Sequence, residues 1–256
     1  MIVLKLGGSV ITEKDRAETL DGEALGRAAD AVAATLEAAG QGPGGSEDET
    51  ADLVIVHGGG SFGHHNASEH GVTTTDGTHD AAAALEIHGA MKTLNQFVLT
   101  RLLERDVQAV PVHPFSAGHR DETAALEFPT GQVETLLAEG FVPVLHGDMI
   151  AHAGSGATVV SGDELVVELA RDLEADRIGL CSTVPGVLDD ADDVIDRISK
   201  YKDVESVLGA SDATDVTGGM AAKVRALLEL EAEASIFGLE ALDSFLRGEP
   251  AGTTIE

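Results

Sequence analysis

Short runs of apolar residues alternate along the chain with longer stretches in which apolar side chains recur every three or four residues. The short runs are typical of buried strands and lie at 1–6, 53–57, 108–113, 141–146, 177–182 and 235–239. The longer stretches predict helices at 20–39, 81–105, 132–139, 163–173, 220–232 and 242–246, and two further apolar runs predict a hairpin at 149–161. This alternation predicts an α/β fold in which a mostly parallel sheet is covered on both faces.

The stretch at 81–105 carries a clear helical pattern. Its apolar side chains recur at i, i+4, i+7, i+11 and i+15, at Ile87, Met91, Leu94, Val98 and Leu102. This spacing places them on one face of a helix. Residues 40–50, with the sequence GQGPGGSEDET, instead predict a surface loop. Because the strand after this loop again ends in glycines, we expect a single domain over residues 1–256.

The composition allows a core but restricts the partners. Of the 256 residues, 43% are apolar and only 3% are aromatic, so aliphatic side chains must fill the interior. The net charge is −29, from 45 acidic and 16 basic residues. Such a chain repels nucleic acid and anionic membranes, which bind to positive surfaces. Because the acids are spread along the whole sequence, they favour a solvated, halophilic surface over an acidic interaction site.

Nothing in the pattern indicates secretion or a membrane. No apolar run approaches the roughly 18 residues of a spanning helix. The first residues, MIVLKLGG, do not resemble a signal peptide. The single cysteine, Cys181, excludes a disulfide framework and lies in an apolar run, where a lone cysteine usually belongs to the core. We expect a soluble, cytoplasmic protein with no membrane and no nucleic-acid partner.

Three glycine-rich segments follow predicted strands or open predicted helices. They are KLGGS at 5–9, HGGGSFGH at 57–64 and TGGMAAK at 217–223. Glycine lets backbone N–H groups converge on an anion, and a helix N-terminus adds a favourable dipole. Two segments carry a lysine, at positions 5 and 223, in a chain with only six lysines, and Lys14 closely follows the first segment. This combination predicts a phosphate-binding site.

Other nucleotide-binding motifs fit the glycines less well. The P-loop pattern GxxxxGK[ST] is absent. Gly58, Gly60 and Gly63 satisfy the pattern GxGxxG, but no clear strand ending in an acid follows about 20 residues later. A dinucleotide-dependent oxidoreductase therefore stays open only as a remote alternative.

Two groups of side chains raise the question of a metal site. The first is a loose cluster of His57, His64, His65 and His70, whose spacing fits no standard ligand pattern. The second is the run of acids at 189–193, which predicts a solvated loop in so acidic a chain. We therefore assign no metal ligand. His64 stands apart because it ends a phosphate-type loop.

The motifs follow an order that resembles a known family. KLGGS, HGGGSFGH, HGD at 146–148, SGDE at 161–164 and DVTGGMAAK at 215–223 are similar to segments of the isopentenyl phosphate kinases, a branch of the amino acid kinase family. The resemblance covers nearly the whole chain. It implies a three-layer αβα sandwich with the amino acid kinase fold, usually a homodimer, that uses ATP and Mg²⁺. It also implies a nucleotide site in the C-terminal part and a small-molecule phosphate acceptor in the N-terminal part.

The resemblance further implies roles for individual residues. Lys5 and Lys223 would hold the transferring phosphoryl group, Asp163 would orient these lysines, and Lys14 would be a supporting cation. The implied ATP-binding residues are Gly7, Gly8, Ser9, Gly60, Thr183, Gly218 and Gly219. The implied acceptor-binding residues are Gly59, Gly60, His64 and Gly162. Residues 182–187, STVPGV, lack both acids of the TDVDGV that relatives typically carry there.

The implied reaction is the ATP-dependent phosphorylation of isopentenyl phosphate to isopentenyl diphosphate in isoprenoid biosynthesis. A phosphate monoester is largely dianionic at neutral pH and needs no general base, so we interpret His64 as an electrostatic clamp. Ile87, Met91 and Ile150 are candidates for an apolar pocket around the acceptor tail or for ordinary core packing. A kinase for fosfomycin or another small phosphonate or acid, and a non-catalytic binding protein on the same fold, stay open as alternatives.

Overall fold

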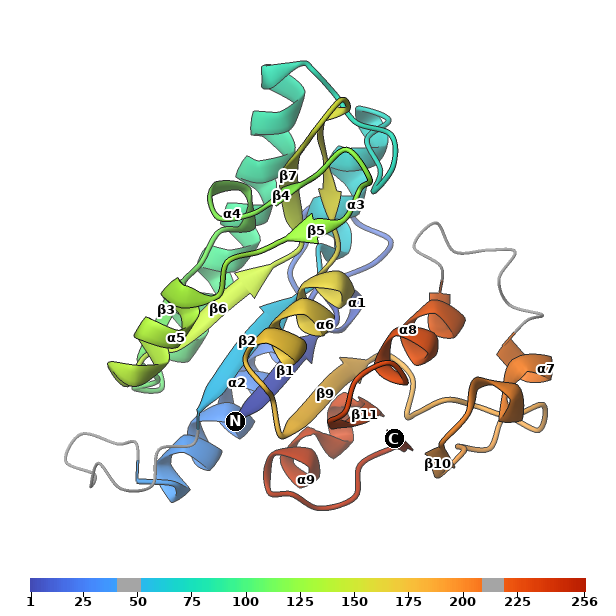
Figure 1. Cartoon of the computed structure of the whole chain (residues 1–256). Coiled ribbons are helices and arrows are strands. Elements are labelled where there is room, and N and C mark those ends of the chain that lie inside the picture. Colours follow the sequence, from blue (N-terminus) through green and yellow to red (C-terminus); the bar gives the residue numbers. More distant parts are fainter. Residues whose placement is uncertain (41–51, 209–218) are drawn as a thin grey trace.

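The main sheet contains all six strands that the short apolar runs predict, and the predicted hairpin lies outside it. The computed structural model describes residues 1–40, 52–208 and 219–256 (Figure 1). The predicted loop, from residue 41 on, and Gly218 lie outside these ranges. Within them, eight strands form the order β10–β12–β11–β9–β1–β2–β6–β3. Their bounds are β1 (Ile2–Leu6), β2 (Leu53–His57), β3 (Ala109–Pro111), β6 (Val142–His146), β9 (Arg177–Ser182), β10 (Arg197–Ile198), β11 (Glu233–Gly238) and β12 (Thr253–Ile255).

Strand β1 lies inside the sheet and carries Lys5. It pairs in parallel with β2 on one side and β9 on the other, with Lys5 opposite Val56 and Leu180. In the main sheet only the β11–β12 pair is antiparallel among the described strands, which confirms the predicted, mostly parallel sheet. The carboxyl ends of β1, β2, β6 and β9 therefore meet at one edge, the usual place for a ligand in such sheets.

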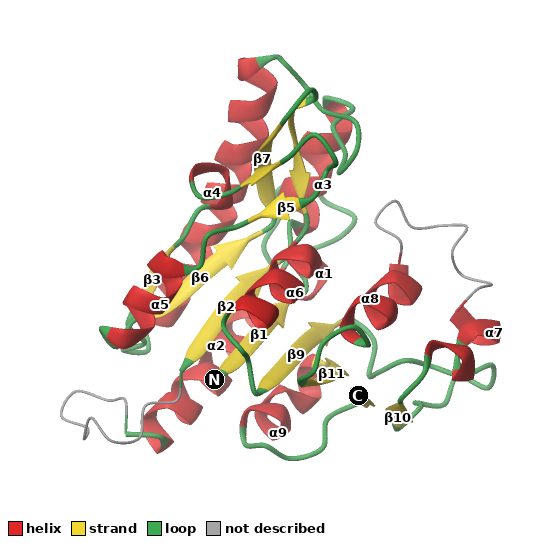
Figure 2. Ribbon diagram, viewed as in Figure 1, coloured by secondary structure: helices red, strands yellow, loops and turns green. Residues whose placement is uncertain are grey.

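Helices cover both faces of this sheet, which confirms the three-layer αβα architecture (Figure 2). The helices are α1 (Gly8–Ile11), α2 (Gly22–Ala38), α3 (Gly60–Glu69), α4 (Ala81–Leu103), α5 (Gly131–Ala138), α6 (Gly162–Asp172), α7 (Glu205–Leu208), α8 (Gly219–Leu227) and α9 (Leu242–Leu246). Side chains of α2, α4 and α9 pack with Leu4 and Leu6 of β1, whereas those of α5, α6 and α8 pack with Val3. Because successive strand residues point to opposite faces, Lys5 faces the same side as Val3, toward α6.

A second, smaller sheet extends beyond the carboxyl edge of the main sheet (Figure 1). Its order is β5–β4–β7–β8, with β4 (His119–Arg120), β5 (Leu126–Glu127), β7 (Asp148–His152) and β8 (Gly156–Val160). Strands β7 and β8 form the predicted hairpin. The sheet packs on α4 through Met149, which clusters with Ala84 and Ile87. In the described part of the chain, no helix is long and apolar enough to cross a membrane.

The sequence prediction differs from the structure at the starts of two helices. Residues 57–64 predict a loop that ends at His64, but α3 begins at Gly60 and His64 lies within it. Glycine disfavours helix, yet burial of Phe62 in the core offsets that preference. Helix α6 begins at Gly162, one residue before the predicted start, and Ser161 caps it with a hydroxyl that accepts a hydrogen bond from the Glu164 N–H. The predicted helix at 220–232 ends earlier, at Leu227.

Candidate active site

Two lysines face one carboxylate at the carboxyl edge of the main sheet. Lys5 Nζ donates a hydrogen bond to Asp163 Oδ1 at 2.6 Å, and Lys223 Nζ lies 3.9 Å from Asp163 Oδ2. Lys5 belongs to β1, Asp163 to the first turn of α6, and Lys223 to α8. The Lys5 side chain is only 10% exposed, and a buried charge without a partner is costly. The fold thus brings together three residues that lie far apart in the sequence.

The start of α6, which carries Asp163, is fixed from two directions. Ser161 and Glu164 form a reciprocal capping box, in which the Glu164 carboxylate accepts a hydrogen bond from the Ser161 N–H at 2.9 Å. Arg120 of β4, which is buried, donates to the same carboxylate through Nη2 at 2.6 Å. The small sheet therefore holds the turn that presents Asp163. No sequence motif marks Arg120, because its partner lies 44 residues away.

The first two glycine motifs interlock. A Cβ on Gly8 would lie 2.1 Å from the backbone N of Gly60, and one on Gly58 would lie 2.6 Å from the backbone N of Gly8. Only glycine permits so close an approach, and Gly60 also has a φ of +49°. Thr12 joins the two segments, since its hydroxyl donates to the Gly8 carbonyl and accepts from the Ser61 N–H. Helices α1 and α3 consequently begin side by side.

A cleft of about 760 Å³ opens beside these groups. The first N–H groups of a helix lack intrahelical acceptors, so the starts of α1, α3 and α6 favour an anion here. The predicted site residues that line the cleft are Lys5, Gly7, Gly8, Ser9, Lys14, Gly60, His64, Gly162, Asp163, Thr183 and Lys223. Gly219 begins α8 but does not line the cleft, and Gly218 is not described.

An apolar pocket of about 480 Å³ adjoins the cleft. It shares His64, Ser68 and Ser161 with the cleft, and the predicted Gly59 lines it. The apolar side chains around it are Ala67, Val72, Ile87, Met91, Val159 and Val160. Two of the three residues proposed for the pocket around the acceptor tail, Ile87 and Met91, therefore line this pocket. The third, Ile150, is fully buried in the core and does not line the pocket.

The histidines of the predicted loose cluster do not share one site. His64 is exposed and lines the cleft, whereas His57 is fully buried at the end of β2. His65 lies 3.7 Å from Glu69, and His70 lies 3.0 Å from Glu86. Among the described residues, no group of three His, Cys, Asp or Glu side chains is placed to hold a metal ion. Cys181 is buried as predicted, and burial raises the pKa of its thiol to about 12, so it stays protonated.

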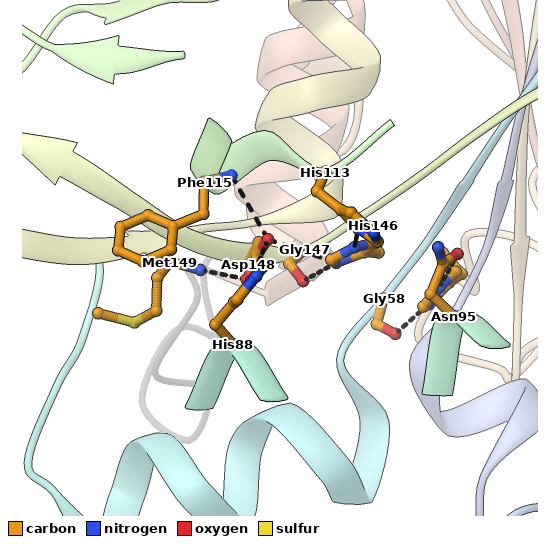
Figure 3. A network of polar contacts seen from close by, with 10 residues as sticks. Gly58, His88, Asn95, His113, Phe115, His146, Gly147, Asp148 and Met149 are labelled. Carbon is orange, nitrogen blue, oxygen red and sulfur yellow. Dashed lines mark hydrogen bonds and ion pairs between the residues drawn. The ribbon is translucent and has the colours of Figure 1, made fainter. Parts of the chain in front are cut away.

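A buried polar network, which no sequence motif indicates, joins histidines at the carboxyl ends of β2 and β6 to Asp148 and His88 (Figure 3). His57 of β2 stacks on His146 of β6, with ring centroids 5.4 Å apart. His146 Nε2 lies 2.8 Å from His113 Nδ1, and His88 Nδ1 lies 2.9 Å from Asp148 Oδ1. Burial lowers the pKa of His57 to about 4 and that of His146 well below its usual value, and burial raises the pKa of Asp148. The imidazoles of His57 and His146 are therefore neutral at neutral pH.

The members of this network are far apart in the chain, so no local pattern reveals them together. One signal was available: His57 and His146 each end a predicted strand and precede a glycine. Parallel strands of one sheet bring such positions into register, and the structure pairs the two histidines directly.

Comparisons with known proteins agree with this architecture. The sequence model described as "Amino acid kinase family" matches residues 1–236. An isopentenyl phosphate kinase from Haloferax volcanii is 57% identical over 100% of this chain and 98% of the relative. Another from Methanocaldococcus jannaschii is 31% identical, again over 100% of this chain and 98% of the relative. A solved isopentenyl phosphate kinase structure superposes with a TM-score of 0.81 at 26% identity, and the match covers all of both chains.

Proposed function

This chain belongs to the amino acid kinase family, and from that premise we propose that it transfers the γ-phosphoryl group of ATP to isopentenyl phosphate. The product is isopentenyl diphosphate, a precursor in isoprenoid biosynthesis. Full-length similarity to isopentenyl phosphate kinases, at 57% identity in one case, supports this substrate. One observation in the structure carries the proposal: a cation-lined cleft with two lysines on a shared carboxylate opens directly into an apolar pocket.

The two cavities match the two ends of the proposed acceptor. A phosphate monoester with a short branched tail has one dianionic end and one apolar end. His64 lines both cavities, and Gly59 lines the apolar one. We therefore assign the phosphate of the acceptor to the shared boundary and its tail to the space beside Ile87 and Met91. Burial of an aliphatic tail stabilises the complex by roughly 25 cal/mol per Å².

Phosphoryl transfer requires positioning and charge stabilisation more than covalent help. A nonbridging oxygen of the acceptor phosphate attacks the γ-phosphorus, and the bond from that phosphorus to the β–γ bridging oxygen breaks, so that ADP leaves. Lys5 and Lys223 stabilise the charge on the transferring oxygens, and Asp163 keeps both ammonium groups at that place. His64 holds the acceptor phosphate. Lys14, exposed at the rim of the cleft, supplies further positive charge.

We assign the nucleotide to the C-terminal part of one domain over residues 1–256 and the acceptor to its N-terminal part. Gly7, Gly8, Ser9 and Gly60 would cradle the terminal phosphate, and Thr183, which also lines the cleft, would contact the rest of the nucleotide. The family resemblance assigns the same role to Gly218 and Gly219. Mg²⁺ would arrive on the nucleotide phosphates, because the described residues offer no three-ligand group of their own. When bound, it neutralises phosphate charge.

Three further features belong to the proposal and rest on sequence arguments. The net charge of −29 supports a halophilic protein that works in high salt. The family resemblance supports a homodimer. The same acidic surface supports a location in a salty cytoplasm.

The test is ADP release in molar KCl with Mg²⁺, ATP and a small panel of acceptors. The panel contains isopentenyl phosphate, dimethylallyl phosphate, fosfomycin, glutamate and UMP, with a reaction lacking acceptor as the control. We expect strong turnover with isopentenyl phosphate and weaker or no turnover with fosfomycin, glutamate and UMP. A preference for fosfomycin would change the assigned substrate but leave the proposed roles of the two lysines unchanged. No turnover with any acceptor would contradict the proposal and favour a binding protein.

A further inference from the structure

His57 lies outside the proposed reaction, yet it directly precedes the glycines of the acceptor motif. Its ring is fully buried at the end of β2. Nδ1 lies 3.1 Å from the Gly58 carbonyl oxygen, and Nε2 lies 3.1 Å from the side-chain amide of Asn95. A carbonyl oxygen only accepts hydrogen bonds. Nδ1 therefore carries a proton and donates it to Gly58.

Asn95 of α4 faces the other ring nitrogen of this tautomer. The neutral ring has one proton, on Nδ1, so Nε2 must accept a hydrogen bond. The Nδ2 of Asn95 is buried and has no partner among the described residues, while its Oδ1 faces Nε2. Rotation of the Asn95 amide by 180° brings its Nδ2–H to His57 Nε2, so that the Nδ2 donor and the Nε2 acceptor pair with each other. Asn95 thus can pair with Nε2, while the Gly58 carbonyl alone requires the proton on Nδ1.

This bond sets the direction of the next N–H group. A peptide unit is planar and trans, so its C=O and N–H point in opposite directions. When the Gly58 carbonyl is drawn to the His57 ring, the Gly59 N–H must point away from the ring. Among the described residues this N–H donates no hydrogen bond, and Gly59 lines the pocket beside His64. The amide is therefore available to an anion.

A second histidine holds the neighbouring strand end in the same way. His146, the partner of His57 in the strand register, has its Nδ1 2.9 Å from the Gly147 carbonyl oxygen. A Cβ on Gly147 would lie 3.4 Å from the Gly162 N and 3.8 Å from the Gly59 N. The backbone N–H groups assigned to the acceptor thus lie next to a peptide that is itself fixed by a buried imidazole.

We infer that His57 is a positioning residue for the acceptor phosphate, acting through its Nδ1–H bond to Gly58 to direct the Gly59 N–H at the acceptor. The inference rests on the proposed function, because the acceptor phosphate is the ligand that this N–H would bind. Without the bond, the Gly58–Gly59 peptide can rotate and the N–H leaves the acceptor. ATP, which we assign to other groups, should be unaffected.

Two substitutions at position 57 separate the two ring nitrogens. In His57→Asn, the amide nitrogen occupies the place of Nδ1 and can still donate to Gly58. In His57→Gln, the amide reaches the place of Nε2 and leaves the Gly58 carbonyl without its donor. We expect the KM for isopentenyl phosphate to rise about tenfold in His57→Gln, the effect of one lost hydrogen bond. It should stay within about threefold of wild type in His57→Asn, and the KM for ATP should not change in either.

Asn95→Leu is the matched control. It removes the partner of Nε2, so it should lower the thermal unfolding midpoint as the position-57 variants do. It keeps the bond to Gly58, so its KM for isopentenyl phosphate should stay near the wild-type value. A loss of acceptor affinity in proportion to stability across all three variants would overturn the inference, as would equal KM values in His57→Asn and His57→Gln.

Failure of this inference is distinguishable from failure of the proposed function. Wild-type turnover of isopentenyl phosphate is measured first, and its absence contradicts the proposed function. If the wild type turns over and only the variants deviate from expectation, the positioning role alone is wrong. If His57→Gln cannot be recovered folded, His57→Asn decides: a tenfold rise in its acceptor KM overturns the inference, and an unchanged KM supports it.

Discussion

At the scale of single residues, Asp163 decides where positive charge lies in the cleft. It holds Lys5 tightly, at 2.6 Å, and Lys223 loosely, at 3.9 Å. The Lys5 ammonium is largely removed from water and takes the position that the carboxylate gives it. The Lys223 side chain is 25% exposed and keeps more freedom. One carboxylate therefore pairs with two ammonium groups, of which that of Lys5 is held in place and that of Lys223 can still move.

Replacing this carboxylate tests its role. In Asp163→Asn we expect kcat to fall by about 100-fold or more, because preorganised charge near the transferring group contributes on that order. The measurement is steady-state ADP release with isopentenyl phosphate, together with thermal unfolding. Asp172→Asn, at the other end of the same helix, is the control and should leave kcat unchanged. A kcat for Asp163→Asn within threefold of wild type would contradict the role given to this residue.

His64 gives a second test at this scale. In His64→Gln, the acceptor phosphate loses a donor that carries positive charge when protonated. We expect kcat/KM for isopentenyl phosphate to fall about 10- to 100-fold, which corresponds to the roughly 1.5–3 kcal/mol of a hydrogen bond to a charged group. His70→Gln, on the same helical segment but facing Glu86, should behave as wild type. Full kcat/KM in His64→Gln would exclude the clamp.

At the scale of elements, two glycine segments must pass each other for the site to form. Each approaches the backbone of the other more closely than any Cβ allows, and Thr12 bonds to both. The contact places the starts of α1 and α3 at the same wall of the cleft. Interlocked loops of this kind tolerate no added side-chain atom, in contrast to glycines that face open space.

A pair of glycine substitutions measures this contact. In Gly8→Ala, the Cβ would lie 2.1 Å from Gly60 N, so one loop must move. We expect loss of turnover by about 100-fold or more and a stability loss of about 1–3 kcal/mol, as for other overpacked positions. Gly89→Ala in the middle of α4 meets no atom within 4 Å and should stabilise the protein by about 0.5–1 kcal/mol. Equal activity of the two variants would show that the interlock is dispensable.

At the level of single elements, the sequence predicts the strands and helices whose apolar residues recur regularly and the turns that contain glycine. Regular apolar patterns predict the strands β1, β2, β6 and β9 and the long helix α4. The sequence does not predict helix α3, because its glycines disfavour a helix and packing of Phe62 in the core offsets that preference. The same limit applies to the site. Lys5 and Lys223 are predicted from the sequence because they lie beside glycine motifs. Arg120 and Asn95 lie in ordinary sequence surroundings, and only their distant partners in the fold distinguish them.

At the scale of the whole molecule, the dominant feature is the charge of −29. Self-repulsion of this size opposes the compact state when it is not screened. Screening changes strongly with salt, since the Debye length is about 30 Å at 0.01 M and about 3 Å at 1 M. A cleft that must receive further anions, the nucleotide and the acceptor phosphate, is exposed to the same field.

The charge predicts a strong dependence on salt. Between about 10 mM and molar KCl we expect the thermal unfolding midpoint to rise by more than about 4 °C, the shift that about 2 kcal/mol produces in a chain of this size. Turnover should rise in parallel. Sucrose is the control, because it strengthens burial without screening charge. Full activity and an unchanged midpoint without added salt would contradict a halophilic surface.

The position of β1 within the sheet also affects how the chain folds during its synthesis. This strand is made before both of its neighbours, and one of them, β9, begins only at Arg177 (Figure 1). While the ribosome is still at work, the apolar segment IVLKL therefore keeps one unpaired edge, which is a template for wrong pairing. Long-range parallel pairing is also slow. That edge consequently stays open to wrong pairing until the later strands emerge, and Lys5 and Asp163 meet only once most of the polypeptide has been synthesised.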